Sequence, residues 1–185
     1  MIDDPLTGRL LVATPVLGDP NFDRTVVLVL EHTDEGAVGL VLNRPSETAV
    51  GEPLPEWDDV SADPPVIFVG GPVAQSAVIG LARGRGEESA DVWRPVVGGV
   101  GIVDLGCSPE AVTPAIEDLR LFAGYAGWGE EQLEGEIEDG AWWVIDASPA
   151  DVLSDHPEGL WAEVLRRQPG PLSMYAHFPA DPTSN

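Results

Sequence analysis

Two apolar runs near the amino terminus dominate the hydrophobic pattern of the chain. They cover residues 25–30 and 37–42, and the polar tetrapeptide Thr33-Asp34-Glu35-Gly36 lies between them. Neither run alternates apolar and polar residues, which is typical of strands that are covered on both faces. A short polar segment that ends in glycine indicates a turn. The pattern therefore predicts a β-hairpin at the centre of a sheet.

Further apolar segments predict other strands, each bounded by glycine, proline or charged residues. They are residues 7–14, 66–69, 78–81, 98–105, 119–125 and 142–145. Two connections also have a clear character. Residues 15–22 contain two prolines, a glycine and two Asx residues, which predicts a structured turn, and residues 83–94 predict a charged, mobile loop.

Helical periodicity is clearest over residues 151–168, where apolar side chains recur on one face. Residues 130–137 predict a second, acidic helix. Ser108 and Pro109 predict the start of a short third helix, with Ile116 on its inward face. No linker divides these elements, so we expect one domain over residues 1–185, ending in a frayed tail at 179–185.

Composition narrows the class of protein. No apolar stretch is long enough to span a bilayer, and the amino terminus is acidic and polar, so we expect a cytoplasmic protein without membrane insertion. The formal net charge is -23, with nine arginines and no lysine. A surface this acidic repels phosphate backbones, so direct nucleic-acid binding is not expected.

Metal and cofactor chemistry find little support in the sequence. The single cysteine, Cys107, excludes a disulfide framework and a Cys-based metal cage, and a lone cysteine favours a packing role. His32, His156 and His177 are far apart and show no metal-ligand spacing. We therefore predict no metal and no cofactor.

Polar side chains at the two ends of the predicted hairpin are the main candidates for binding. They are Asp19, Asn21, Arg24, His32, Asn43 and Arg44. The two arginines could hold a carboxylate of the same chain, which the abundance of acidic residues favours, or receive an anionic ligand. His32 could act as a general base, although a lone histidine at a strand end favours a structural hydrogen bond. Asn43 is interpreted as a turn residue that satisfies backbone groups, with ligand binding as the alternative.

Four further residues complete the set of ligand-binding candidates. Gly70 and Gly71 could present backbone N–H groups to an anion, although Pro72 removes one donor. Trp128 and Gln132 have helical spacing, which favours packing of a helix against the sheet. No GxSxG segment is present, so no catalytic residue is predicted.

The chain resembles the AlgH/YqgE family of bacterial proteins over residues 8–165. The segments that carry the resemblance are LLVATPVLGDPNFDRTVVLVLEH, GAVGLVLNRP, FVGGPV and GYAGWGEEQLEGEI, in this order. The resemblance implies a compact α+β fold, in which a mixed, strongly bent sheet forms a pseudo-barrel with helices packed outside. It also implies a largely uncharacterised function, with a regulator label that rests on a genetic role in exopolysaccharide control.

One departure from the family pattern affects the candidate site. Many relatives resemble an Arg-Gly-Phe-hydrophobic-hydrophobic-His segment after Gly-Gly-Pro-Val, whereas this chain has Ser76-Ala77-Val78-Ile79-Gly80-Leu81. We therefore expect no polar contribution from this strand.

Three functional hypotheses follow. The first is a non-enzymatic binding or regulatory module, in which a cleft near Asp19, Arg24, His32, Asn43 and Arg44 binds a small ligand or a protein segment. The second is an enzyme that acts on an anionic small molecule, with the arginines as a clamp and His32 as the base. The third is a DNA-binding regulator, which the net charge argues against.

Overall fold

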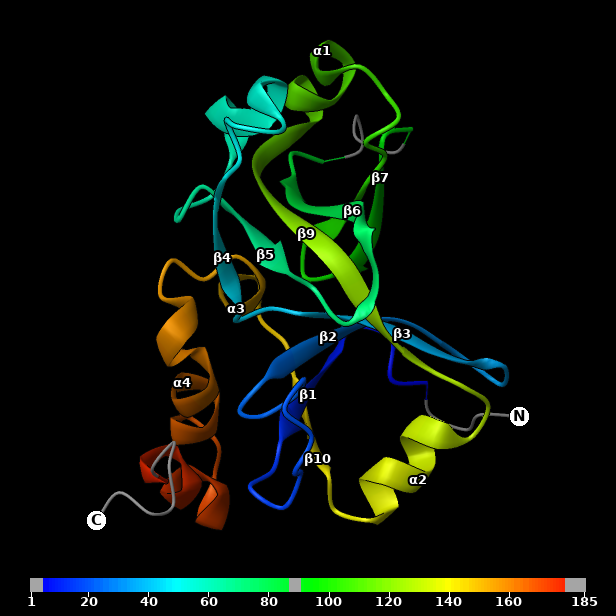
Figure 1. Ribbon diagram of the computed structural model, residues 1–185, viewed down its shortest axis with the longest axis vertical. Coiled ribbons are helices and arrows are strands. Elements are labelled where there is room, and N and C mark those ends of the chain that lie inside the picture. Colours follow the sequence, from blue (N-terminus) through cyan, green and yellow to red (C-terminus); the bar gives the residue numbers. More distant parts are fainter. Residues whose placement is uncertain (1–4, 87–90, 179–185) are drawn as a thin grey trace.

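The computed structural model describes residues 5–86 and 91–178 of the chain. Within them, ten strands form a single mixed sheet that bends into a half-barrel, with helices packed around it (Figure 1). The main path of the sheet has the order β10-β1-β2-β3-β9-β6-β8-β7, and β4 and β5 join it through β9. This confirms the predicted α+β class and the strongly bent, mixed sheet.

The strands follow the chain at short intervals. Their bounds are β1 (Arg9–Ala13), β2 (Val26–Thr33), β3 (Gly36–Val41), β4 (Pro45–Ala49), β5 (Val66–Val69), β6 (Val73–Gly84), β7 (Trp93–Val97), β8 (Val100–Val103), β9 (Ile116–Trp128) and β10 (Trp142–Asp146). The helices are short, with three to eight residues each. Their bounds are η1 (Pro55–Val60), α1 (Pro109–Val112), η3 (Thr113–Ala115), α2 (Gln132–Glu138), α3 (Pro149–Val152), η4 (Pro157–Gly159), α4 (Leu160–Arg166) and η5 (Gly170–His177).

The predicted hairpin is confirmed as β2 and β3, which pair antiparallel in the middle of one half of the sheet. Successive strand residues point to opposite faces, so each face needs its own cover. Leu28 packs on the face that α4 covers, whereas Val27 packs on the face that carries Leu133 of α2. Both faces of β2 are therefore buried, which explains the lack of polar alternation in its sequence.

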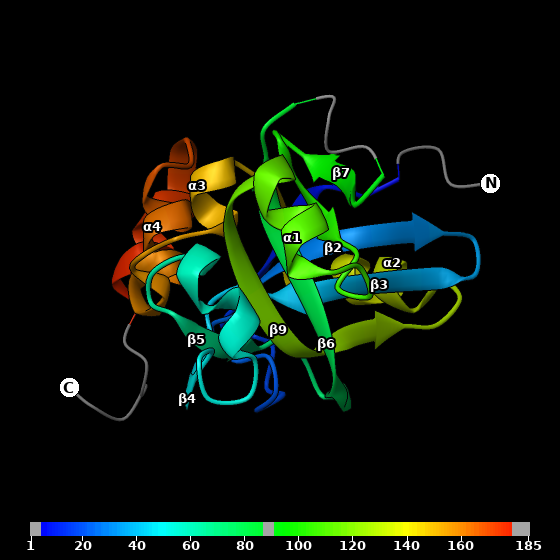
Figure 2. The ribbon, with the colours of Figure 1, turned by 90° about the horizontal axis from the view of Figure 1, so that it is seen from above.

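Strand β9 connects the two halves of the bent sheet (Figures 1 and 2). Its carboxyl end pairs with β3, its residues from Ile116 to Tyr125 pair with β6, and Phe122 lies opposite Phe68 of the parallel strand β5. The chain after β5 passes very close to β9. A Cβ atom on Gly71 would lie 2.2 Å from the carbonyl oxygen of Tyr125, so no larger residue fits there without backbone movement.

Several sequence-based predictions of local structure are wrong. The predicted helix at 151–168 is divided into α3, η4 and α4, because Pro157 cannot continue a helix. Ile116 belongs to β9, because the short helix from Pro109 ends before it. The segment after the hairpin also forms a strand that was not predicted, β4, which begins at Pro45, a position where proline is tolerated.

The predicted loop at 83–94 is also shorter than expected. Its first two residues end β6 and its last two begin β7, while residues 87–90 lie outside the described part of the chain. The predicted strand at 98–105 is β8, preceded by a turn in which Gly98 and Gly99 both have positive φ. The predicted frayed tail at 179–185 falls outside the described residues.

A buried arginine joins the sheet to the connection between α3 and α4. Arg120 of β9 is 2% exposed, and its guanidinium donates to the carbonyl oxygens of Ser154 at 2.7 Å and Asp63 at 2.6 Å. Burial lowers the pKa of Arg120 to about 10, although nearby carboxylates act against the shift.

In the described residues, no helix is both long and apolar enough to cross a membrane.

Candidate functional site

The first end of the hairpin is built around His32, which β2 places in the core with 6% exposure. Its Nδ1 accepts a hydrogen bond from the backbone N–H of Leu6 at 3.0 Å, and its Nε2 lies 2.7 Å from Oε1 of Glu134. Because Nδ1 accepts, the ring proton is on Nε2 and is donated to Glu134. Both ring nitrogens are therefore occupied, which agrees with the structural interpretation of His32.

Glu134 was not among the candidates from the sequence, because nothing in its spacing relates it to His32. Burial acts to raise the pKa of the Glu134 carboxyl. Hydrogen bonds from its own backbone amide and from His32 outweigh that effect, so its pKa is lowered. The pair attaches α2 to the end of β2.

Trp128 and Gln132 lie at the same end of the hairpin, where β9 meets α2. Trp128 is buried and contacts the rings of Phe22 and Trp142, with centroids 6.3 and 6.1 Å away. The side-chain oxygen of Gln132 accepts from the backbone N–H of Gly129 at 3.0 Å. Both residues therefore hold the start of α2, as the packing interpretation predicts.

A second carboxyl group at this end also has a shifted pKa. Burial raises the pKa of Glu136 on α2, and the nearby Asp19 carboxylate adds to the shift, while the indole N–H groups of Trp128 and Trp142 oppose it. Asp19 also accepts a hydrogen bond from the backbone N–H of Asn21 at 2.9 Å. The loop at 15–24 therefore reaches both ends of the hairpin. Asp19 lies near α2 at one end, and Asn21 lies near Arg44 at the other.

The second end of the hairpin contains Asn43, Arg24 and Arg44. The side chain of Asn43 accepts from the backbone N–H of Val26 at 3.0 Å and donates to the carbonyl oxygen of Arg24 at 2.9 Å. Arg24 has φ of 54°, a conformation that non-glycine residues rarely adopt. Asn43 therefore stabilises this turn, which agrees with its predicted turn role.

Arg24 and Arg44 both bind backbone carbonyls. Arg24 donates to the carbonyl oxygen of Phe178 at 2.8 Å and lies 4.1 Å above the ring of Trp161. Arg44 donates to the carbonyl oxygens of Asn21, Pro20 and Asp23. Neither arginine forms an ion pair with a carboxylate within residues 5–86 and 91–178. The favoured prediction of internal ion pairs is therefore not met there.

A small cavity adjoins Arg44, and we call it the Arg44 cavity. It has a volume of about 30 Å³ and is lined by Asn21, Val41, Arg44, Val69, Gly71, Pro72 and Gln75. Gly70 lies next to it, but its N–H already donates to the carbonyl oxygen of Ala123 at 2.8 Å. The backbone of Gly70 is therefore not available as an anion-binding donor, which weakens the nest interpretation.

The structure brings the predicted residues together only in part. Asn21, Arg44 and Gly71 line one cavity, with Arg24, Asn43 and Gly70 close to them in the chain. His32, Trp128 and Gln132 lie at the opposite end of the hairpin. The five residues of the first hypothesis thus do not share one concave surface.

Gln75 was missed by the sequence analysis. It lies in the exposed first half of β6, one residue before the segment that departs from the family pattern. It supplies a polar group from this strand, where none was expected. Its place two residues after Pro72-Val73 is the only signal in the sequence that could have indicated it.

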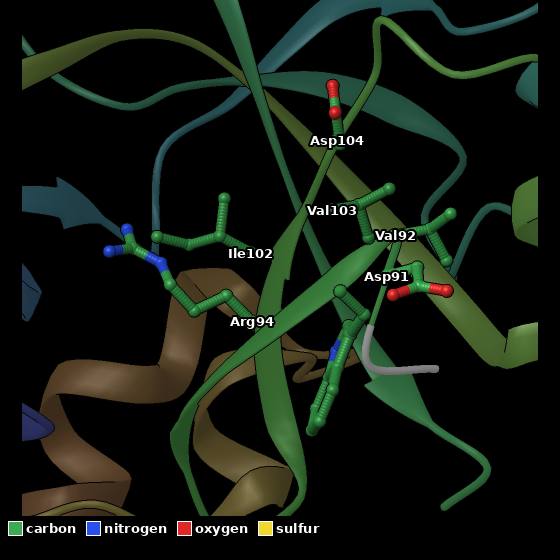
Figure 3. A pocket seen from close by; sticks show the side chains of 7 residues that line it. Asp91, Val92, Arg94, Ile102, Val103 and Asp104 are labelled. Atoms are coloured by element: carbon green, nitrogen blue, oxygen red, sulfur yellow. The ribbon is translucent and has the colours of Figure 1, made fainter. Parts of the chain in front are cut away.

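A second, more open hollow of about 200 Å³ lies on β7 and β8 (Figure 3). The side chains around it diverge, with Arg94 and Ile102 on one side and Val92 and Asp91 on the other. Asp104 already accepts from the backbone N–H of Gly106 at 2.9 Å, and Trp93 donates to the carbonyl oxygen of Ala82 at 2.8 Å. Its polar groups therefore do not converge on a common ligand position.

Metal binding finds no support in the part of the chain that the structure describes. There, no three histidine, cysteine, aspartate or glutamate side chains gather closely enough to hold an ion. Cys107 is half-buried, and burial together with the adjacent Asp104 raises the pKa of its thiol. A raised pKa disfavours the thiolate, the form of cysteine that binds metals and attacks substrates.

Comparisons with known proteins agree on one family. The family model described as AlgH-like matches residues 10–173. A UPF0301 protein of Streptomyces coelicolor is 53% identical over 184 residues, covering 97% of this chain and 95% of that protein. A UPF0301 protein of Mycobacterium avium is 47% identical over 181 residues, covering 96% and 90%.

Solved structures extend the comparison to the fold. The crystal structure of a protein from Corynebacterium diphtheriae superimposes with a TM-score of 0.89 at 36% identity, covering 96% of this chain and 95% of that one. The solution structure of the AlgH protein from Pseudomonas aeruginosa gives a TM-score of 0.69 at 29% identity, covering 96% of both chains. On the sequence match and the shared fold, this chain belongs to the AlgH-like family.

Proposed function

We propose that the protein is a binding module without a reaction of its own, and that its ligand binds at the Arg44 cavity. The observation that carries the proposal is the state of Arg44. Three backbone carbonyls hold its guanidinium in place, no carboxylate among the described residues neutralises it, and it borders a cavity. A cation held in this way is positioned in advance for a ligand.

The arrangement gives less support to the alternative, an enzyme that acts on an anionic small molecule. That alternative needs His32 as a base near the arginines. His32 lies at the other end of the hairpin, is buried, and has both ring nitrogens occupied. A general base must reach the proton that it removes, either directly or through one water molecule.

A regulatory role of the kind that the family resemblance implies would then act through this ligand or through a protein partner. The net charge of -23 argues against direct contact with DNA. The expected cytoplasmic location remains a prediction.

The test is a screen of anionic, neutral and cationic small molecules, measured by thermal shift and followed by backbone-amide NMR. A true ligand raises the melting temperature, because it binds the folded state, and moves the amide signals around Asn21, Arg44 and Gln75. Gln75→Ala should weaken that binding, and the control Arg94→Ala, in the open hollow on β7 and β8, should leave it unchanged. Ligands that move signals only elsewhere, or that are converted to product, would overturn the proposal.

A further inference from the structure

We propose that the group held in the Arg44 cavity is a carboxylate, supplied either by a free short-chain acid or by the carboxyl terminus of a peptide. This inference rests on the proposed function and specifies the chemistry of its ligand. It is argued from the donors, size and charge of the cavity, and from the surface beside it.

Arg44 keeps single donors for an anion. Its Nη1 donates to one backbone carbonyl and its Nη2 to two, which leaves the Nε–H and one Nη1–H, and these lie on different edges of the guanidinium. Asn21 and Gln75 also line the cavity, and the side-chain amide of each is a donor. A carboxylate can accept one hydrogen bond from Arg44 and others from these amides, and a charge-assisted hydrogen bond of this kind is about twice as strong as a neutral one.

The size favours a carboxylate over a phosphate. A cavity needs a volume of at least about 10–15 Å³ to hold one water molecule. The Arg44 cavity, at about 30 Å³, therefore holds two or three atoms of the size of a water oxygen. The two oxygens of a carboxylate fit this space, whereas a tetrahedral phosphate has four. Phosphate sites also depend on free backbone N–H groups, and here Gly70 is bonded to Ala123 and Pro72 has none.

The charge of the cavity favours a single negative charge. Arg44 is the one ionisable group among the described residues that line it. One arginine can neutralise one carboxylate, but it would leave a dianion with an excess charge inside a protein of net charge -23. A cationic ligand would face Arg44 without any lining carboxylate to balance it.

The surroundings offer contact to an apolar group next to the carboxylate. Val41, Val69 and Pro72 form the apolar part of the lining. Val73, which follows Pro72 in the chain, is 39% exposed. An acid with a short alkyl chain could therefore bury some of that chain on this surface, so affinity should increase with chain length.

The test is an NMR titration of the full chain at neutral pH and constant ionic strength with acetate, propionate, butyrate, propionamide and inorganic phosphate. We expect propionate to move the signals around Asn21 and Gln75 and to bind at least about tenfold more tightly than propionamide or phosphate. Butyrate should bind more tightly than acetate. Equal affinity for propionamide, or tighter binding of phosphate, would overturn the inference.

Variants connect the binding to Arg44. Arg44→Lys should weaken propionate binding about tenfold, because lysine cannot hold the carbonyls and the ligand at the same time. Gln75→Ala, at an exposed position, should weaken it about threefold without risk to folding. The control Arg94→Lys should have no effect. Unchanged propionate affinity in Gln75→Ala together with folded Arg44→Lys would contradict the assignment.

A peptide arm separates the two sources of the carboxylate. An N-acetylated tetrapeptide of alanine and valine with a free carboxyl terminus is compared with the same peptide amidated at that end. Tighter binding of the free-acid peptide than of butyrate identifies a peptide as the source, and weaker binding identifies a free acid. Cavity-binding hits that are all neutral would refute the carboxylate and keep the proposed function, whereas no cavity-binding compound at all would refute both.

Discussion

Each end of the β2–β3 hairpin has a basic side chain, and the two differ in burial and in how many of their hydrogen-bonding groups have partners within the chain. At one end His32 is buried, and backbone and carboxylate partners occupy both of its ring nitrogens. At the other end Arg44 is half-buried, bonded only to carbonyls, and next to a cavity. His32 has no spare hydrogen-bonding capacity, whereas Arg44 has two N–H groups and a positive charge to offer.

The difference shows how a polar residue at a strand end can be assigned. His32 and Arg44 are both basic residues near a strand end, so their chemical class and their position do not distinguish a structural role from a binding role. The count of satisfied donors and acceptors does, because a group whose partners are all inside the chain gains little from a ligand. By this criterion Asn43 and His32 are structural, and Arg44 is available for binding.

The largest expected effect comes from Gly71→Ala in the wall of the Arg44 cavity. The added Cβ would lie 2.2 Å from backbone atoms of Tyr125, so β9 or the chain after β5 must move. We expect a loss of at least about 3 kcal/mol in the free energy of unfolding, measured by urea denaturation. The control is Gly135→Ala on α2, where a Cβ meets nothing within 4 Å and should stabilise the protein by about 0.5–1 kcal/mol. Similar values for the two variants would contradict the close approach.

Next in size is His32→Ala, which tests the closed end. It leaves the N–H of Leu6 without an acceptor and removes the partner of Glu134, so we expect a loss of about 2–3 kcal/mol in the same measurement. His156→Ala is the matched control, because that side chain is 83% exposed. A small effect of His32→Ala on stability, or a loss of ligand binding in a folded variant, would place His32 with the binding residues.

Arg44→Lys should have a smaller effect on stability than on binding. Lysine can replace only part of the hydrogen bonding to the loop at 20–23, so we expect a loss of about 1 kcal/mol in unfolding free energy. Thermal denaturation with and without propionate measures both effects. If the stability loss reached that of His32→Ala while binding was unchanged, Arg44 would be structural and the contrast between the two ends would disappear.

The smallest effect is a pH dependence from Glu136. Its pKa is raised in the folded protein, so ionisation is harder there than in the unfolded chain. The free energy of unfolding should therefore fall as pH rises from the ordinary carboxyl pKa through the raised value. Glu136→Gln should remove this slope and make the variant slightly more stable than the parent at neutral pH. Denaturation at several pH values between 4 and 7 would show it, and parallel curves for parent and variant would contradict the shift.

Much of the sheet could be predicted because most strands carry their own local signal, although β4 and β7 were not predicted. The apolar runs that became β2 and β3 are bounded by turn residues. The prediction of one helix over 151–168 was wrong, because the apolar periodicity continues through Pro157 whereas the helix is divided there. The prediction that Ile116 belongs to a helix was wrong for a related reason. From the sequence alone, a buried residue at the end of a helix cannot be distinguished from the first residue of a strand.

The candidate site was predictable only at the level of residue types. Asn21, Arg44 and Gly71 were all named from the sequence, and they do line one cavity. Gln75 and Glu134 were missed, because their partners lie far away in the chain and no spacing relates them. His32 was grouped with Arg44 because both flank the same hairpin, although the length of the strands keeps them at opposite ends.

The sequence by itself determined the family, the central hairpin and the acidic character that disfavours nucleic acid. Local propensity and net charge follow from the residues themselves, so they can be derived without knowing which residues are in contact. Only the tertiary structure decided which polar groups are satisfied. The bend of the sheet brings residues 20–23, 44 and 71–75 together, and the partners that occupy a side chain are set by that packing. Arg44 is therefore available for binding, and His32 is not.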